Sequence, residues 1–333
     1  MSPGSCVLVF VEQTDGVVSG SSLEALAMGK KAAAASGIPL AALVLGRDLG
    51  QAAQEILHYG VEKVYCAEHE LLADYHPDLY VPAFLSACES ARPGSVLMAE
   101  TLLALDLVPR LAFALGVGCL TDCVSMDYDK AGQTFVFTKP VYSGNVMGAY
   151  TLPKEPMLAT FRARATDPAE RQDASKGEVV KVGLKLDASA KKYESVARVL
   201  AKDEGGPKLE NATIVVSGGR GLGGPEGFET LGQLAALMGG ALGASRPPCD
   251  LGWVNPKTQV GITGTIVAPP LYIAVGISGS TQHVAGMADS KKIVAINNNK
   301  DANIFKVADY GVIGDFEEVI PAFSDAVKKI LNP

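Results

Sequence analysis

LYIAVGISGSTQHVAGM, residues 271–287, joins a run typical of a buried strand to a turn of small residues and then to a helix. Residues 271–275 are apolar throughout, as in a parallel strand that is covered on both faces. Gly276 and Gly279 allow a tight turn, and the first helical turn would point free N–H groups at an anion. The pattern predicts a diphosphate-binding crossing, with His283, the only histidine in the C-terminal half, at the helix start.

Length and composition limit the class of protein. The chain has 333 residues, which suits about two domains. With 48% hydrophobic residues, 36 glycines and 20% charged residues, it suits a globular α/β protein with buried parallel strands. The net charge of −7 argues against nucleic acid or an anionic membrane as a partner. Because we see neither an export signal nor an apolar run of about 18 residues, we expect a cytoplasmic protein that is not membrane-embedded.

Strand-like and helical patterns alternate in the first part of the chain, as in βαβ units. The predicted strands are 6–11, 40–45, 63–66 and 95–98, and the predicted helices are 23–36, 51–58, 77–90 and 107–115. From about residue 121 the pattern changes to short runs of period two, at 123–128, 133–139, 146–152 and 157–161. These runs predict an antiparallel ribbon added to a Rossmann-like α/β domain over residues 1–190.

A polar segment separates this domain from a second one. Residues 191–207 have the charge, glycine and proline content of an exposed linker. The second domain, 208–333, begins with a β-branched strand at 212–217 and keeps βα alternation to a last helix at 316–331. Its length is typical of one doubly wound domain. The first domain has no comparable phosphate loop, so we assign it to subunit assembly.

The loop after strand 212–217 is rich in glycine. Gly219, Gly221 and Gly224 satisfy the G-x-G-x-x-G spacing, which by itself is a weak signal because glycines also serve plain turns. A hydride-transfer dinucleotide fold would place an acidic residue about 20 residues further on, to hold the ribose. Arg246 stands in that neighbourhood instead. An arginine there suits a phosphorylated ribose, as in an NADP-dependent oxidoreductase, or a different ligand.

Six separated motifs carry a resemblance to one family. They lie at residues 218–221, 244–246, 259–264, 275–283, 295–297 and 308–311. In this order and spacing they resemble the alpha subunit of electron-transfer flavoprotein. The resemblance is dense from about residue 209 to 323 and looser in the first domain, where 138–145 and 160–162 look like the family's segments.

The resemblance implies that the second domain binds FAD. The residues it implies are Arg220, Ser245, Arg246, Val260, Gly261, Ile262, Thr263, Ser278, Gly279, Ser280, Thr281, Gln282, His283, Asn297, Asp315 and Phe316. The position of Ser278 to Ser280 suits a pyrophosphate. Asn297 and Asp315 each follow an apolar strand, at the sheet edge where α/β proteins bind ligands, and suit ribose or adenine.

The resemblance also implies roles around the flavin ring. His283 resembles the residue at the flavin C2 carbonyl, where a donor or cation stabilises negative charge on the one-electron-reduced ring. Arg246 resembles an arginine beside the ring, whose fixed charge raises the potential, and Thr263 resembles the hydroxyl donor to N5. The alternative for His283 is a helix histidine that caps a neighbouring carbonyl, and the alternative for Arg246 is a surface ion pair. Arg220 suits either a pyrophosphate oxygen or the partner subunit.

Some positions depart from the family pattern. Ile262 and Thr265 stand where the family usually has glutamine and lysine, so a polar flavin contact is missing. Pro247 and Pro248 after Arg246 stiffen the backbone that presents the arginine. The six cysteines, Cys249 among them, are scattered, and we interpret them as reduced packing residues without a zinc site.

The resemblance implies an electron carrier that converts no substrate itself. Its FAD, in a heterodimer with a beta subunit, would take electrons from flavoprotein dehydrogenases such as the acyl-CoA dehydrogenases of fatty acid beta-oxidation. It would pass them to a membrane quinone oxidoreductase or another acceptor. Three alternatives stay open: an electron-bifurcating complex with a second FAD in the beta subunit, the NADP-dependent oxidoreductase, and a binding module that has lost its flavin.

Overall fold

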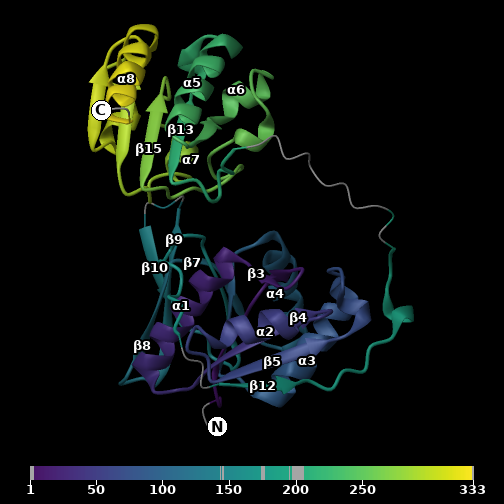
Figure 1. Cartoon of the computed structure of the whole chain (residues 1–333). Coiled ribbons are helices and arrows are strands. Elements are labelled where there is room, and N and C mark those ends of the chain that lie inside the picture. The colour runs from purple at the N-terminus through teal and green to yellow at the C-terminus, as the bar shows by residue number, and fades with distance from the viewer. Residues whose placement is uncertain are drawn as a thin grey trace. The chain divides into compact units, whose positions relative to one another are not determined.

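The computed structural model describes residues 4–142, 144, 146–173, 177–194, 196 and 206–331. The chain divides into two compact units, Met1–Arg198 and Val199–Pro333 (Figure 1). Of the predicted linker 191–207, residues 195 and 197–205 lie outside the described residues, as do Ser143 and Asn145 of the segment 138–145. Within the described residues, no helix has the length and apolar character needed to cross a membrane.

The first unit is built on a seven-stranded parallel sheet in the order β12-β5-β4-β1-β6-β11-β7. Its strands are β1 (Val7–Phe10), β4 (Leu40–Gly46), β5 (Lys63–Glu68), β6 (Ser95–Ala99), β7 (Cys119–Cys123), β11 (Met157–Phe161) and β12 (Glu178–Lys181). All residues of β1, β4, β6 and β11 are buried, which explains their unbroken apolar runs.

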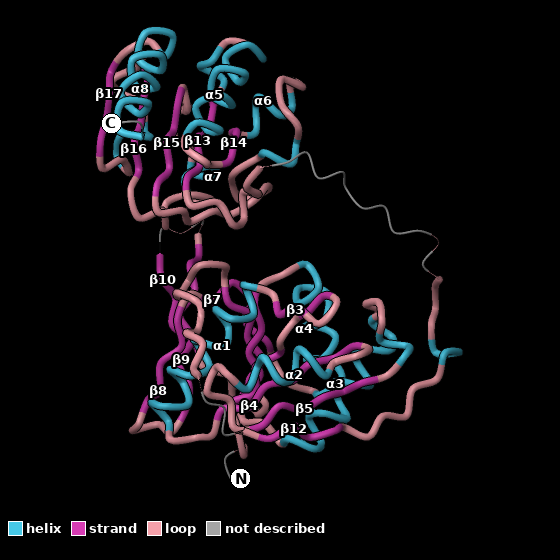
Figure 2. The backbone as a smooth tube through the Cα atoms, viewed as in Figure 1, coloured by secondary structure: helices cyan, strands magenta, loops and turns pink. Residues whose placement is uncertain are grey.

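Helices cover both faces of this sheet (Figure 2). They are α1 (Gly20–Ser36), α2 (Gly50–Leu57), α3 (Pro77–Ala91) and α4 (Leu102–Leu115), with a short hairpin, β2 (Gln13–Thr14) and β3 (Val17–Val18), before α1. One core lies under α1 and α2 and the other under α3 and α4. Helix α4 begins five residues before the predicted start at 107, because the Thr101 side chain accepts a hydrogen bond from the Ala104 N–H and caps it.

A three-stranded antiparallel sheet confirms most of the predicted ribbon. Its strands are β8 (Ser125–Asp129), β9 (Thr134–Val141) and β10 (Val146–Tyr150), in the order β10-β9-β8. Residues 157–161 do form the predicted strand, but its assignment to the ribbon was wrong, since β11 lies parallel between β6 and β7 and all of its residues are buried. The predicted strand 123–128 is also divided, because the chain leaves the parallel sheet at Val124.

The second unit has a five-stranded parallel sheet in the order β14-β13-β15-β16-β17. Its strands are β13 (Ile214–Gly218), β14 (Ala241–Ala244), β15 (Leu271–Val275), β16 (Ile293–Asn297) and β17 (Tyr310–Ile313), and its α-helices are α5 (Pro225–Leu237), α6 (Arg246–Asp250), α7 (Thr281–Val284) and α8 (Phe316–Leu331). Helices α5 and α8 lie together over one face (Figure 2). The chain runs from β13 to β14 on one side and then crosses to β15 on the other side of β13. The strand order therefore reverses between the neighbouring strands β13 and β15, where α/β sheets bind ligands.

Candidate cofactor site

Two loops meet at this reversal point, one after β13 and one after β15. The N–H of Gly219 donates to the carbonyl of Val275 at 2.8 Å, and the N–H of Gly221 donates to the carbonyl of Gly276 at 3.0 Å. A Cβ added to Gly219 would lie 2.2 Å from the Gly276 oxygen, so only glycine permits this approach. The two loops therefore form one cradle of backbone at the carboxyl edge of the sheet.

The turn after β15 has the predicted form, but its helix is short. Gly276 and Gly279 have φ angles of 62° and 82°, the left-handed region that favours glycine. Helix α7 has only four residues, and the side chain of its N-cap Ser280 makes no capping hydrogen bond. The dipole of so short a helix is small. Anion binding here would rest on the loop N–H groups and on the hydroxyls of the exposed residues Ser278 and Ser280.

A cavity of about 210 Å³ opens beside this cradle. It is lined by Gly221, Leu222, Gly223, Gly276, Ile296, Asn297, Asn298, Gly314, Asp315, Phe316 and Glu317. Three of the predicted residues, Asn297, Asp315 and Phe316, thus share one wall with the glycine loop. The sequence interpretation missed Asn298, Gly314 and Glu317, although each follows closely on an apolar strand and could have been found by that signal.

Asn297 and Asp315 are held in different ways. The buried Asn297 donates from Nδ2 to the Ile277 carbonyl, and its Oδ1 accepts from the N–H of Asn299, both at 2.9 Å. It therefore ties the turns after β15 and β16 together. Asp315 is exposed, and its Oδ1 accepts from the N–H of Glu317 at the start of α8. Its carboxylate stays accessible to a hydroxyl donor such as a ribose.

The other predicted residues divide by exposure. Exposed are Arg220, Arg246, Ile262, Thr263, Ser278, Ser280, Thr281 and Gln282; buried are Ser245, Val260, Gly261, Gly279 and His283. The side chains of the first group are accessible from solvent, whereas those of the second are closed to it. Arg246 begins α6, and its Nε lies 3.1 Å from Oδ2 of Asp250 in a pair whose side chains are 65% and 61% exposed. The Thr263 hydroxyl accepts a hydrogen bond from Gln259 at 2.8 Å.

His283 lies inside the unit and is held by two hydrogen bonds. Its Nδ1 is 3.0 Å from the Val260 carbonyl oxygen, and its Nε2 is 3.0 Å from the hydroxyl of Tyr272. Burial lowers the pKa of His283 to about 4, although the hydrogen bond to Val260 raises it. Of the two forms expected from the sequence, this pKa favours the neutral ring over the cation near pH 7.

This buried histidine makes stability depend on pH. Its pKa is about 4 in the folded chain and about 6.5 in the unfolded chain, so the unfolded chain binds more protons between these values. Stability is full above pH 6.5 and falls as the pH drops toward 4. We expect the second unit to lose about 2 kcal/mol between pH 7 and pH 5. Urea unfolding followed by Trp253, the only tryptophan, measures this loss.

The matched control for this prediction is a His283→Gln variant. Its amide does not titrate, so most of the difference between the two pH values should vanish. An equal loss of stability in the wild type and in this variant would show that other groups cause the acid effect.

The cysteines of the chain serve packing. Cys6, Cys66, Cys88, Cys123 and Cys249 are buried, and Cys119 is half-buried. Burial raises the pKa of the Cys66 thiol to about 11 and that of Cys123 to about 12, so both are protonated near pH 7. No group of three or more His, Cys, Asp or Glu side chains that could hold a metal exists in the described part of the chain.

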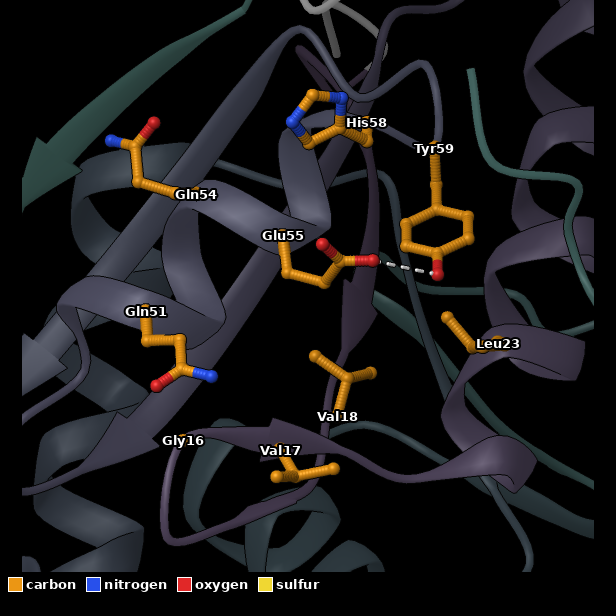
Figure 3. A pocket seen from close by; sticks show the side chains of 9 residues that line it. All are labelled: Gly16, Val17, Val18, Leu23, Gln51, Gln54, Glu55, His58 and Tyr59. Atoms are coloured by element: carbon orange, nitrogen blue, oxygen red, sulfur yellow. Dashed lines mark hydrogen bonds between the residues drawn. The ribbon is translucent and has the colours of Figure 1, made fainter. Parts of the chain in front are cut away.

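A second cavity, of about 460 Å³, lies in the first unit (Figure 3). It is lined by Gly16, Val17, Val18, Leu23, Gln51, Gln54, Glu55, His58 and Tyr59. Glu55 accepts from Tyr59 and from Arg171, and His58 Nδ1 lies 3.0 Å from the Gln172 carbonyl.

Comparison with known proteins identifies the family. Residues 7–187 match the model described as electron transfer flavoprotein domain, and residues 208–288 match the electron transfer flavoprotein FAD-binding domain. The electron transfer flavoprotein subunit alpha of Clostridium acetobutylicum is 38% identical over 331 residues, 98% of each chain. That of Thermoanaerobacterium thermosaccharolyticum is 37% identical over 325 residues, 97% of this chain and 98% of the other. The chain belongs to the electron transfer flavoprotein family, as an alpha subunit.

A further relative of this alpha subunit, the protein FixB of Azorhizobium caulinodans, is 36% identical over 335 residues, 98% of this chain and 89% of that protein. The FAD-binding domain falls on the unit that contains the glycine cradle. The site fits an FAD diphosphate. The loops after β13 and β15 approach each other this closely only because Gly219 and Gly221 lack a Cβ, and the turn after β15 carries hydroxyls and no carboxylate. FAD, when bound, supplies the electron-accepting and electron-donating chemistry of the alpha subunit.

Proposed function

We propose that this electron carrier works in a heterodimer with an electron transfer flavoprotein beta subunit, takes electrons from acyl-CoA or related flavoprotein dehydrogenases, and passes them to a membrane quinone oxidoreductase. The observation that carries the proposal is similarity over nearly the whole length to proteins named as alpha subunits. We assign subunit assembly to residues 1–190, FAD binding to 208–333, and the connection between them to 191–207.

The site residues divide among the parts of the cofactor. We propose that the N–H groups and hydroxyls of residues 278–282 hold the diphosphate, beside Arg220. Asn297, Asp315 and Phe316, which line the cavity, would hold the adenosine part. Arg246 and Thr263, both exposed at loops that end near the carboxyl edge of the sheet, would face the flavin ring. These two side chains would be positioned by the backbone of the buried residues Ser245, Val260 and Gly261.

Buried residues explain why this arrangement would be stable without the ligand. Ser245 donates its N–H to the carbonyl of Gly218 at 2.9 Å, and Val260 donates its N–H to that of Ala244 at 2.8 Å. The N–H of Ile262 donates to the carbonyl of Gln282 at 3.0 Å. The loop 260–263 is thus held to both β14 and α7, which limits the rearrangement needed on binding.

The donor assignment has a direct test. The chain is purified with its beta subunit, and the flavin absorbance is followed by stopped flow after adding a catalytic amount of an acyl-CoA dehydrogenase and excess acyl-CoA. We expect complete bleaching that depends on the dehydrogenase. Bleaching by NADPH alone, with none from the dehydrogenase, would instead favour the NADP-dependent oxidoreductase.

A further inference from the structure

Tyr272 is the one hydroxyl-bearing residue of β15, and it is 0% exposed. Its strand lies between β13 and β16, and Tyr272 is paired with Val215 on one side and Ile293 on the other. The hydroxyl lies 3.0 Å from His283 Nε2, and the ring of His283 is itself only 4% exposed. A phenylalanine would fill this space as well, whereas a buried hydroxyl is costly unless it is paired.

The partners of His283 fix where its proton lies. A backbone carbonyl can only accept, so Nδ1 must carry the hydrogen that bonds to the Val260 oxygen. In the neutral ring Nε2 is then a lone pair and accepts from the Tyr272 O–H. Only one tautomer, with the proton on Nδ1, satisfies both hydrogen bonds.

A second proton on the ring would end the hydrogen bond that Tyr272 donates to it. Nε2 would become a donor, so the Tyr272 hydroxyl would have to accept from it and turn its own proton to another acceptor. Ser217 on β13 is buried, and its hydroxyl lies near that of Tyr272, since it lowers the pKa of Tyr272 against the larger raising effect of burial. Neither Tyr272 nor Ser217 carries a charge that would stabilise a protonated His283, and the hydrogen bond from Tyr272 to Nε2 favours the neutral ring.

We propose that Tyr272 is a positioning residue that holds His283 as its neutral Nδ1–H tautomer and, through it, holds the loop 260–263 beside α7. The part of this inference that concerns the flavin rests on the proposed function. With both ring nitrogens engaged, His283 has no free N–H. It can donate from Nε2 toward a flavin carbonyl only when Nε2 is protonated, and Tyr272 sets how readily that occurs.

The experiment is ¹⁵N NMR of the full-length chain with labelled histidine, with and without FAD. His283 is one of four histidines, and the difference from a His283→Gln variant assigns its signals. We expect a protonated Nδ1 and an unprotonated Nε2 at pH 7. In Tyr272→Phe we expect the Nε2 shift to change and the His283 pKa to rise by about one unit, as for the loss of one hydrogen bond to the neutral form. Tyr310→Phe, an exposed tyrosine on β17, should change neither.

The outcomes separate this inference from the proposed function. A proton on Nε2 of the wild type would overturn the inference without the need for any variant, and so would a Tyr272→Phe chain whose histidine titrates like the wild type. A chain that shows the Nδ1–H tautomer but binds no FAD would contradict the proposed function and leave the relation between Tyr272 and His283 standing.

Discussion

A Gly219→Ala variant is expected to bind FAD about 30- to 150-fold more weakly than the wild type. The added Cβ would lie 2.2 Å from the Gly276 oxygen, so the loops after β13 and β15 must move apart. Strain of about 2–3 kcal/mol from such overpacking corresponds to that range of affinity. The dissociation constant of the stripped chain for FAD, measured by quenching of flavin fluorescence, checks it.

A Gly232→Ala variant provides the matched control. Gly232 lies within α5, and a Cβ there would meet only the Leu242 side chain, at 3.9 Å. Alanine in a helix is more favourable than glycine by up to about 1 kcal/mol, so this variant should fold at least as well and bind FAD normally. If Gly219→Ala kept an affinity within threefold of this control, the cradle would not hold the cofactor.

Removal of the Arg246 charge should have the second large effect, on the potential of the flavin. A positive charge near the ring stabilises the reduced, more negative flavin, and a charge interaction of about 1–2 kcal/mol corresponds to roughly 40–90 mV per electron. We therefore expect Arg246→Ala to lower the potential of the bound flavin by that amount. A redox titration against reference dyes, followed by flavin absorbance, measures the change.

Asp250 allows a test in the opposite direction. Because it pairs with Arg246 at 3.1 Å, Asp250→Asn removes a nearby negative charge while the arginine stays. The potential should then stay the same or rise. If Arg246→Ala left the potential where it is in the wild type, Arg246 would be a surface ion pair and its assignment to the ring would be wrong.

Much of the second unit could be predicted from the sequence, because its signals are local. The apolar run 271–275 followed by Gly276 and Gly279 predicted a buried strand and a tight turn, and both exist. What the sequence did not reveal depends on contacts between distant segments. The length of α7 is one example, and the pairing of Met157–Phe161 with β6 and β7 is another.

The candidate site, too, could be predicted where its signals are local and not where it depends on distant contacts. Residue types indicated which side chains could meet a cofactor, and Asn297, Asp315 and Phe316 do line one cavity. The sequence could not show that His283 would be buried between Tyr272 and Val260, 11 and 23 residues away. Since protonation depends on burial and on such distant partners, the neutral state of His283 emerges only from the structure.

The most direct test of the central claim is the flavin content of the chain purified with whatever subunit accompanies it. Absorbance and mass spectrometry of the released cofactor give the identity of the nucleotides and their ratio to protein. We predict one FAD for each alpha subunit, in a complex with a beta subunit. Two FAD per heterodimer would point to an electron-bifurcating complex, and a colourless chain that takes up no FAD would contradict the account.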